Sequence, residues 1–106
     1  MRTLAVGDIH GCYHALRTLE AFVEFQPNDH IITLGDHIHR GPDSRSVIEW
    51  LIARQKNGCL TALRGNHECV FQAAITSELD RETWLGIGGD RMLASYQVQS
   101  INQIPI

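Results

Sequence analysis

The segment GDHIHRG, residues 35–41, joins a predicted strand to a predicted helix. The apolar run at residues 31–34 before it predicts a buried strand, and Pro42-Asp43-Ser44 after it is typical of a helix start. A single turn therefore carries a carboxylate, two imidazoles and a guanidinium. In an open α/β sheet, ligands bind at such turns, beyond the carboxyl ends of the strands.

Two further turns have the same character. GDIHG, residues 7–11, follows the apolar residues 3–6, and RGNHE, residues 64–68, follows the apolar residues 59–63. The β-α-β-α-β-α alternation predicts an α/β fold with a mainly parallel sheet and right-handed crossovers. Strands that are nearly all apolar predict a sheet covered on both faces. The predicted helices span residues 13–25, residues 43 or 44 to 56, and residues 68 to about 77.

The pattern weakens after residue 79. Residues 84–90 read as a glycine-rich loop with Trp84 packed beneath it, and residues 91–96 as a short helix. Near the end, Ile101, Ile104 and Ile106 look like residues that lack a partner surface. We therefore expect residues 1–106 to be the N-terminal part of a longer, here incomplete, domain.

Composition sets further bounds. A chain of 106 residues with 43% apolar residues forms one domain at most. A net charge of −3 and a pI near 6.0, with scattered basic residues, argue against nucleic acid or membrane as partner. Three cysteines without CxxC spacing indicate reduced thiols and a cytoplasmic protein. No leader pattern and no apolar run of about 20 residues is visible.

The three turns offer a metal-ligand set. Asp8 and His10, two apart in an extended turn, can point to the same side, and Asp36 can bridge two ions from the neighbouring turn. Asn66 adds a neutral amide oxygen. Such ligands suit Mn, Fe, Zn or Mg. Two ions roughly 3.5–4 Å apart can hold a hydroxide and polarise a phosphoryl group for in-line attack.

The same turns supply groups for phosphate chemistry. His67 is placed to protonate a leaving oxygen, and Arg40 and Arg64 carry guanidinium forks that match phosphate oxygens. Each turn alone is ordinary turn chemistry. Because the three sets follow three consecutive strands at similar positions, together they indicate one site.

GDIHG, GDHIHRG and RGNHE resemble the signature motifs of calcineurin-like metallophosphoesterases, most closely GDxHG, GDxxDRG and GNHE of the phosphoprotein phosphatase branch. The Trp84-Leu85-x-x-Gly88-Gly89 run is similar to bacterial members, which include serine/threonine protein phosphatases and symmetrical diadenosine tetraphosphatases. The resemblance implies an α/β/β/α sandwich, of which residues 1–106 would be the N-terminal part. It also implies hydrolysis of phosphoserine or phosphothreonine in proteins, with a symmetrical dinucleoside tetraphosphate as the alternative substrate.

The resemblance implies two divalent ions, with manganese expected and iron, zinc, magnesium or nickel as alternatives. By matching positions, it assigns Asp8, His10 and Asp36 to the first ion, Asp36 and Asn66 to the second, His67 as general acid, and Arg40 and Arg64 to phosphate binding.

Two departures from the family pattern matter. His39 stands where the family carries an aspartate that pairs with the catalytic histidine, so we expect weakened general-acid catalysis, because two protonated imidazoles would repel. As an alternative, His39 or His37 contacts metal.

The second departure concerns the family's further histidine ligands, because no histidine follows His67 here. By the resemblance both ions are under-ligated, so we expect the 106 residues alone to bind metal poorly and to show little turnover. We also expect them to expose the sheet edge and the face that the rest of the domain would cover. A non-catalytic relative that binds phosphate or a partner, and a truncated product of a complete enzyme, remain as alternatives. The oligomeric state is open.

Overall fold

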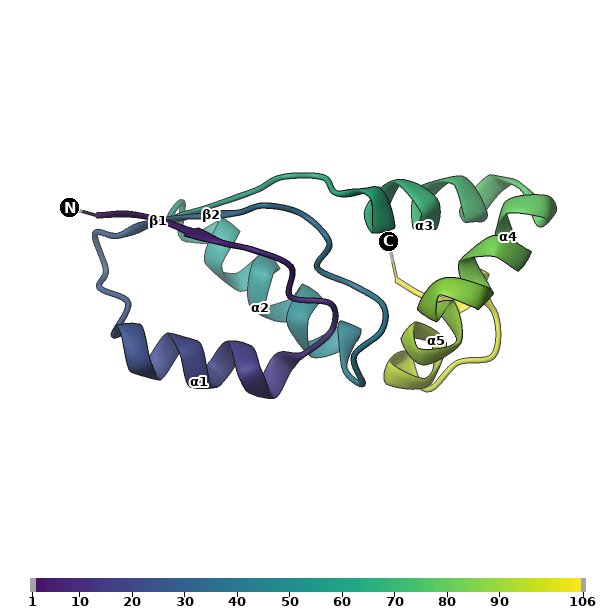
Figure 1. Ribbon diagram of the computed structural model, residues 1–106, viewed down its shortest axis with the longest axis horizontal. Coiled ribbons are helices and arrows are strands. Elements are labelled where there is room, and N and C mark those ends of the chain that lie inside the picture. Colours follow the sequence, from purple (N-terminus) through teal and green to yellow (C-terminus); the bar gives the residue numbers. More distant parts are fainter. Residues whose placement is uncertain (1, 106) are drawn as a thin grey trace.

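The computed structural model describes residues 2–105, which form an elongated molecule with extents of 45 × 21 × 20 Å (Figure 1). One end holds a three-stranded parallel sheet in the order β1-β2-β3. The strands are β1 (Thr3–Val6), β2 (His30–Thr33) and β3 (Leu60–Ala62). This confirms the predicted α/β fold with a small parallel sheet.

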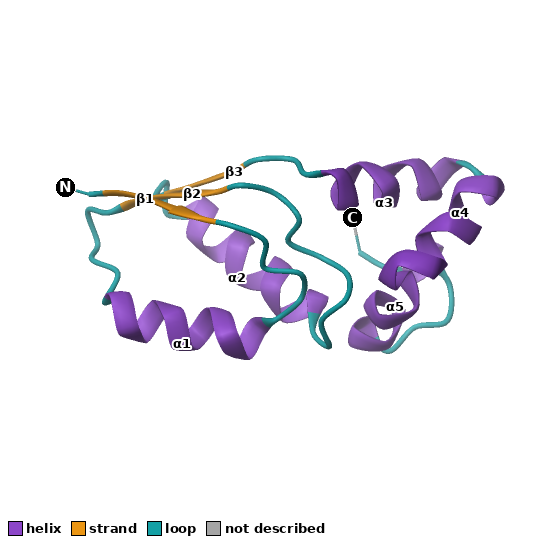
Figure 2. Cartoon of the chain, in the orientation of Figure 1, coloured by secondary structure: helices purple, strands orange, loops and turns teal. Residues whose placement is uncertain are grey.

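Helices α1 (Tyr13–Val23) and α2 (Ser44–Lys56) lie on one side of this sheet (Figure 2). Helix α2 begins where predicted, because the Asp43 carboxylate accepts a hydrogen bond from the Ser46 N–H at 3.1 Å. The apolar faces of both helices pack on the sheet and form the first core. Its buried members are Ile9, Leu16, Ile31, Val47, Trp50, Leu51 and Leu60.

The opposite face of the sheet is open. Along β1, Leu4 and Val6 are partly buried, whereas Thr3 and Ala5 are exposed, and in β3 Thr61 is exposed. Residues 2–105 therefore cover only one face of the sheet, as expected of these residues without the rest of the domain. The apolar composition of the strands indicated cover that no described element of this chain provides.

Helices α3 (Asn66–Thr76), α4 (Glu78–Trp84) and α5 (Asp90–Tyr96) gather at the other end of the molecule (Figure 1). The sequence predicted α3 but not α4, which begins after Ser77, whose hydroxyl accepts from the Asp80 N–H at 3.3 Å. These helices enclose a second core. Its buried members are Ile38, Ala74, Trp84, Met92, Ile101 and Ile104.

The glycine-rich segment is not a loop. Residues Leu85–Gly89 join α4 to α5 through a tight, kinked turn, whose backbone leaves helical geometry at Gly88, where φ is +123°. A Cβ at Gly88 would lie 2.7 Å from the Arg40 nitrogen, and one at Gly89 would overlap the Trp84 ring. The glycines therefore allow close packing against the turn after β2.

Gly88→Ala should destabilise the fold by about 3 kcal/mol. The left-handed backbone costs an L-residue roughly 1–2 kcal/mol, and the contact with the Arg40 backbone adds overpacking strain of similar size. Urea unfolding followed by circular dichroism measures the change. Gly86→Ala is the matched control, because a Cβ there meets nothing within 4 Å. Equal stability of the two variants would contradict this account of the close approach.

The C-terminal residues also differ from expectation. Ile101 and Ile104 are each 4% exposed, since the 3₁₀ turn Ile101–Gln103 folds them into the second core. The expectation that they lack a partner surface is wrong, while Ile106 lies outside the described residues. Within residues 2–105, no helix has the length and apolarity to cross a membrane.

Candidate active site

The turns after β1 and β2 are joined by their backbones. The N–H groups of Ile9 and His10 both donate to the Asp36 carbonyl, at 3.2 and 3.0 Å, and the Gly11 N–H donates to the His37 carbonyl at 2.8 Å. Because the strands are parallel, their carboxyl ends meet at one edge of the sheet. The polar side chains of both turns are therefore held at that edge.

Four non-glycine residues in these turns have left-handed backbones, with φ of 46° at His10, 53° at Asp36, 72° at His39 and 65° at Arg40. This conformation is uncommon outside glycine and gathers at functional sites. The Gly41 N–H donates to the His10 carbonyl at 2.7 Å and helps to fix both turns. The strained segment is the one that carries the predicted site residues.

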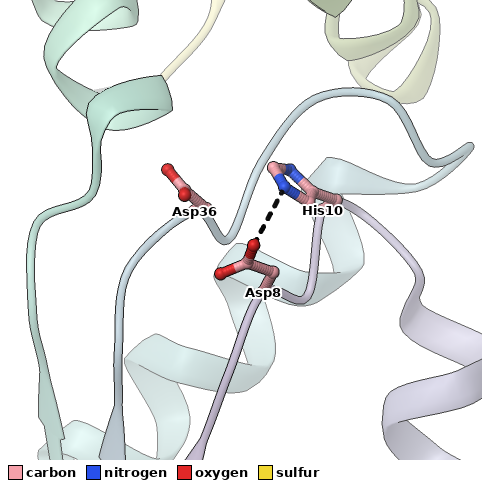
Figure 3. A group of neighbouring side chains, drawn as sticks. All are labelled: Asp8, His10 and Asp36. Atoms are coloured by element: carbon pink, nitrogen blue, oxygen red, sulfur yellow. Dashed lines mark ion pairs between the residues drawn. The ribbon is translucent and has the colours of Figure 1, made fainter.

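Asp8, His10 and Asp36 lie beside one another, and the Asp8 carboxylate and the His10 ring point toward each other (Figure 3). One ligand atom of each lies within 4.8 Å of those of the other two, and His10 Nε2 is 3.7 Å from Asp8 Oδ2. The structure therefore brings together the three residues assigned to the first ion. Two carboxylates and an imidazole from separate turns form a donor set that fits a divalent cation.

The His10 ring is oriented for coordination. Its Nδ1 lies 3.1 Å from the Ile38 carbonyl oxygen, which only accepts, so Nδ1 carries the proton. Nε2 then presents a lone pair on the side of the Asp8 carboxylate. Histidine ligands of metals commonly donate their other nitrogen to a carbonyl in this way. The neighbouring turn thus fixes the tautomer that a metal ligand requires.

Asn66 lies at the start of α3 with its side-chain amide against the Asp36 carboxylate. With its nitrogen turned toward Asp36, it donates to Oδ1 and Oδ2 at 2.9 and 3.1 Å. The His67 backbone N–H also donates to Asp36 Oδ1, at 3.0 Å. The third turn is therefore docked on Asp36, and in this orientation the Asn66 amide nitrogen, not its oxygen, faces the carboxylate.

His67 is 6% exposed, and its ring meets His10 edge to face with a centroid distance of 4.7 Å. The fully buried His39 contacts it, with 3.1 Å between the two Nδ1 atoms, and the Trp84 Nε1–H donates to His39 Nε2 at 2.6 Å. His37 lies beside Thr33, 2.8 Å from its hydroxyl, and Glu68. Since both His37 and His39 use both ring nitrogens in these contacts, neither is turned to a metal.

Burial and the adjacent imidazoles lower the pKa of both site histidines, His39 and His67. Burial, and after it the neighbouring His67, lowers the pKa of His39 to about 4. Burial, and after it the nearby His10, also lowers the pKa of His67. The two rings that the sequence analysis expected to oppose each other's protonation are in direct contact, and His39 is neutral at pH 7.

Arg40 and Arg64 are both exposed, and neither guanidinium takes part in an ion pair within residues 2–105. Arg40 borders an open pocket of about 500 Å³, which is also lined by residues 85–88 and by Arg91. The Arg91 side chain donates to the Arg40 carbonyl at 2.6 Å. Arg40 is therefore held beside the site with its side chain free to reach an anion.

Glu68 is a positioning residue to which the sequence analysis gave no role. Its carboxylate accepts from the backbone N–H groups of Asp36 at 2.5 Å, His37 at 2.8 Å and Gly65 at 2.9 Å. Burial would raise the pKa of Glu68, but the His37 side chain and these backbone donors outweigh it and lower the pKa to about 2. Glu68 stands three residues after the N-cap Gly65, as the glutamate of a capping box does, and that spacing was the available signal.

Glu68→Gln should destabilise the protein by ~1–3 kcal/mol near pH 7, because one amide oxygen cannot accept all three buried N–H groups. The folded-state pKa lies below the unfolded value of 4.5, so this stabilisation is complete above pH 4.5 and is lost as the pH falls toward about 2. Urea unfolding of both proteins at neutral pH and at about pH 3 measures the difference. It should shrink in acid, whereas the exposed control Glu82→Gln should change nothing; a pH-independent difference would contradict the assignment.

Comparison with known proteins identifies the class. The sequence model of the calcineurin-like phosphoesterases matches residues 1–104, so the chain belongs to the calcineurin-like phosphoesterase family. The resemblance read from the three motifs is thereby confirmed.

Among its relatives is a symmetrical bis(5'-nucleosyl)-tetraphosphatase of Erwinia tasmaniensis, 42% identical over 69 residues, which cover 64% of this chain and 24% of that protein. Serine/threonine-protein phosphatase 1 of Salmonella typhimurium is 37% identical over 101 residues, which cover 90% of this chain and 44% of that protein. A crystal structure described as a candidate diadenosine tetraphosphatase aligns with a TM-score of 0.61 at 27% identity, over 90% of this chain and 42% of that one. This chain thus spans less than half the length of these relatives.

Proposed function

We propose that these residues form the N-terminal half of a dinuclear, metal-dependent phosphohydrolase site. Asp8, His10 and Asp36 would hold one divalent ion, and Asp36 and Asn66 a second, with manganese expected. The observation that carries the proposal is the convergence of the Asp8, His10 and Asp36 ligand atoms within 4.8 Å. When bound, such ions supply Lewis-acid activation of a phosphoryl oxygen and of the attacking water.

The protein's own side chains supply the rest of the chemistry. Exposed Arg40 and Arg64 would bind phosphate oxygens through two N–H groups each and hold the group in line. His67, buried beside His10, would donate a hydrogen from its ring to the leaving oxygen. The three free cysteines support a reducing, cytoplasmic setting.

Two substrate classes remain candidates. Phosphoserine and phosphothreonine in proteins are the first, supported by the phosphatase from Salmonella that aligns over 90% of this chain. A symmetrical dinucleoside tetraphosphate is the second, and His39 favours it. Without a carboxylate beside it, His67 is a weak proton donor, which matters less when the leaving group departs as a stabilised anion.

Hydrolysis of p-nitrophenyl phosphate by the 106-residue chain, with Mn²⁺ and with a chelator, tests the proposal. We expect slow turnover that requires the metal, because ligands implied by the family resemblance lie outside these residues. Turnover that is equal with and without metal would contradict the proposal. Metal binding without any turnover would instead favour the non-catalytic reading, a module that binds phosphate or a partner.

A further inference from the structure

Three buried rings form a continuous hydrogen-bonded chain that ends at His67. Trp84, His39 and His67 are 1%, 0% and 6% exposed. The Trp84 Nε1–H donates to His39 Nε2 at 2.6 Å, and His39 Nδ1 lies 3.1 Å from His67 Nδ1. From the sequence, Trp84 is expected only to pack beneath the glycine-rich segment. It lies 45 residues from His39, so the sequence does not indicate their contact.

The direction of each proton in this chain follows from one chemical fact. The indole nitrogen only donates, so His39 Nε2 must present a lone pair to Trp84. A neutral imidazole carries one ring proton, which in His39 is then on Nδ1. That proton points to His67 Nδ1, so His67 Nδ1 must accept. The ring proton of neutral His67 is therefore on Nε2.

The opposite arrangement is unfavourable. A proton on His39 Nε2 would face the indole N–H at 2.6 Å, two donors without an acceptor in a fully buried place. Leaving a buried donor unsatisfied costs ~1–3 kcal/mol. In the described chain every buried side-chain nitrogen or oxygen has a partner within hydrogen-bond distance.

We propose that Trp84 and His39 are positioning residues that fix His67 in the tautomer with its proton on Nε2. Trp84 sets the tautomer of His39, and His39 in turn occupies His67 Nδ1. The catalytic meaning of this arrangement rests on the proposed function, because only a hydrolase needs a directed proton at His67. The tautomer of His67 does not depend on the proposed function, because the three rings and their hydrogen bonds set it without substrate or metal.

The test is nuclear magnetic resonance of the full chain with ¹⁵N-labelled histidine, without metal, at a pH about one unit above the ordinary histidine pKa of ~6.5. The resonance of each ring nitrogen reports whether that nitrogen carries a proton. We expect a proton on Nδ1 but not Nε2 of His39, and on Nε2 but not Nδ1 of His67. The reverse pattern in either ring would overturn the proposal.

Two variants test the direction of control. Trp84→Phe keeps an aromatic ring but removes the donor, so both histidines should shift toward a mixture of tautomers. His39→Asp offers only acceptors, so His67 Nδ1, which carries no proton in the wild type, should become protonated. Phe71→Leu is the control, because the Phe71 ring packs against His39 and Trp84 without a hydrogen bond, and it should leave the tautomers unchanged.

The outcomes separate this inference from the proposed function. Unchanged tautomers in Trp84→Phe would overturn the role of Trp84, and if that variant does not fold, the wild type and His39→Asp still decide. Absence of hydrolysis with the expected tautomers would count against the function alone. Metal-dependent hydrolysis with the reverse tautomers would count against the inference alone.

Discussion

Asp36→Asn should abolish Mn²⁺-dependent hydrolysis of p-nitrophenyl phosphate, with a loss of at least about 10³-fold in kcat/KM. Asp36 is the one residue assigned to both ions. Its carboxylate also accepts hydrogen bonds from the Asn66 amide and from the His67 backbone N–H, the second at 3.0 Å. The substitution keeps the side-chain shape but removes the charge and one acceptor oxygen, so the loss reports on metal binding only where circular dichroism shows that the fold is unchanged.

Asp80→Asn is the control for this loss. It removes an exposed carboxylate from the first turn of α4, outside the site. Circular dichroism of both variants should match that of the wild type. Activity of Asp36→Asn within about twofold of wild type, with the same dependence on Mn²⁺, would show that the three turns do not form the metal site.

His39→Asp should raise turnover of a phosphoserine peptide by about 10²-fold while changing p-nitrophenyl phosphate hydrolysis little. General-acid catalysis contributes roughly 10²–10⁴-fold where the leaving group needs a proton. A serine oxygen needs one, whereas nitrophenolate departs as a stabilised anion. An aspartate would accept from both Trp84 and His67, favour the His67 imidazolium, and tolerate the left-handed backbone at position 39.

His39→Asn is the matched control, because it offers an acceptor oxygen without negative charge. It should give a much smaller gain on the phosphoserine peptide. Parallel changes on both substrates would indicate a general effect on folding or metal binding. No change on either substrate would contradict the view that a neutral histidine at position 39 weakens the acid.

The convergence of Asp8, His10 and Asp36 could be predicted from the sequence, because each lies in a turn that directly follows a strand. Asp8, His10, Asp36 and Asn66 each follow a strand within a few residues, and parallel strands bring such turns to one edge. Pairing of consecutive strands through helical crossovers left few alternative topologies. The motifs and the strand order both place these side chains at one edge of the sheet, so residue types and spacing were enough to predict that they lie close together.

The sequence did not predict contacts between distant segments. Trp84 reaches His39 across 45 residues, and Glu68 reaches Asp36 across 32. No periodic pattern in the sequence connects Trp84 with His39 or Glu68 with Asp36. The glycines of residues 85–89 suggested a loop by local propensity, but close packing of Gly88 on His39 and of Gly89 on Trp84 accompanies a tight, kinked turn between two helices. The apolar strands indicated that the sheet needs cover on both faces, but they did not identify what covers the face that residues 2–105 leave open.

Calorimetric titration of Mn²⁺ into the 106-residue chain tests most directly whether these turns form a divalent metal site. The account predicts weak binding by the wild type, with a Kd on the order of 0.1–1 mM, which corresponds to roughly 4–5 kcal/mol. Asp8→Asn should weaken that binding at least about tenfold, and Asp80→Asn should not affect it. Absence of binding, or equal binding by wild type and Asp8→Asn, would contradict the central claim that Asp8, His10 and Asp36 hold a metal ion.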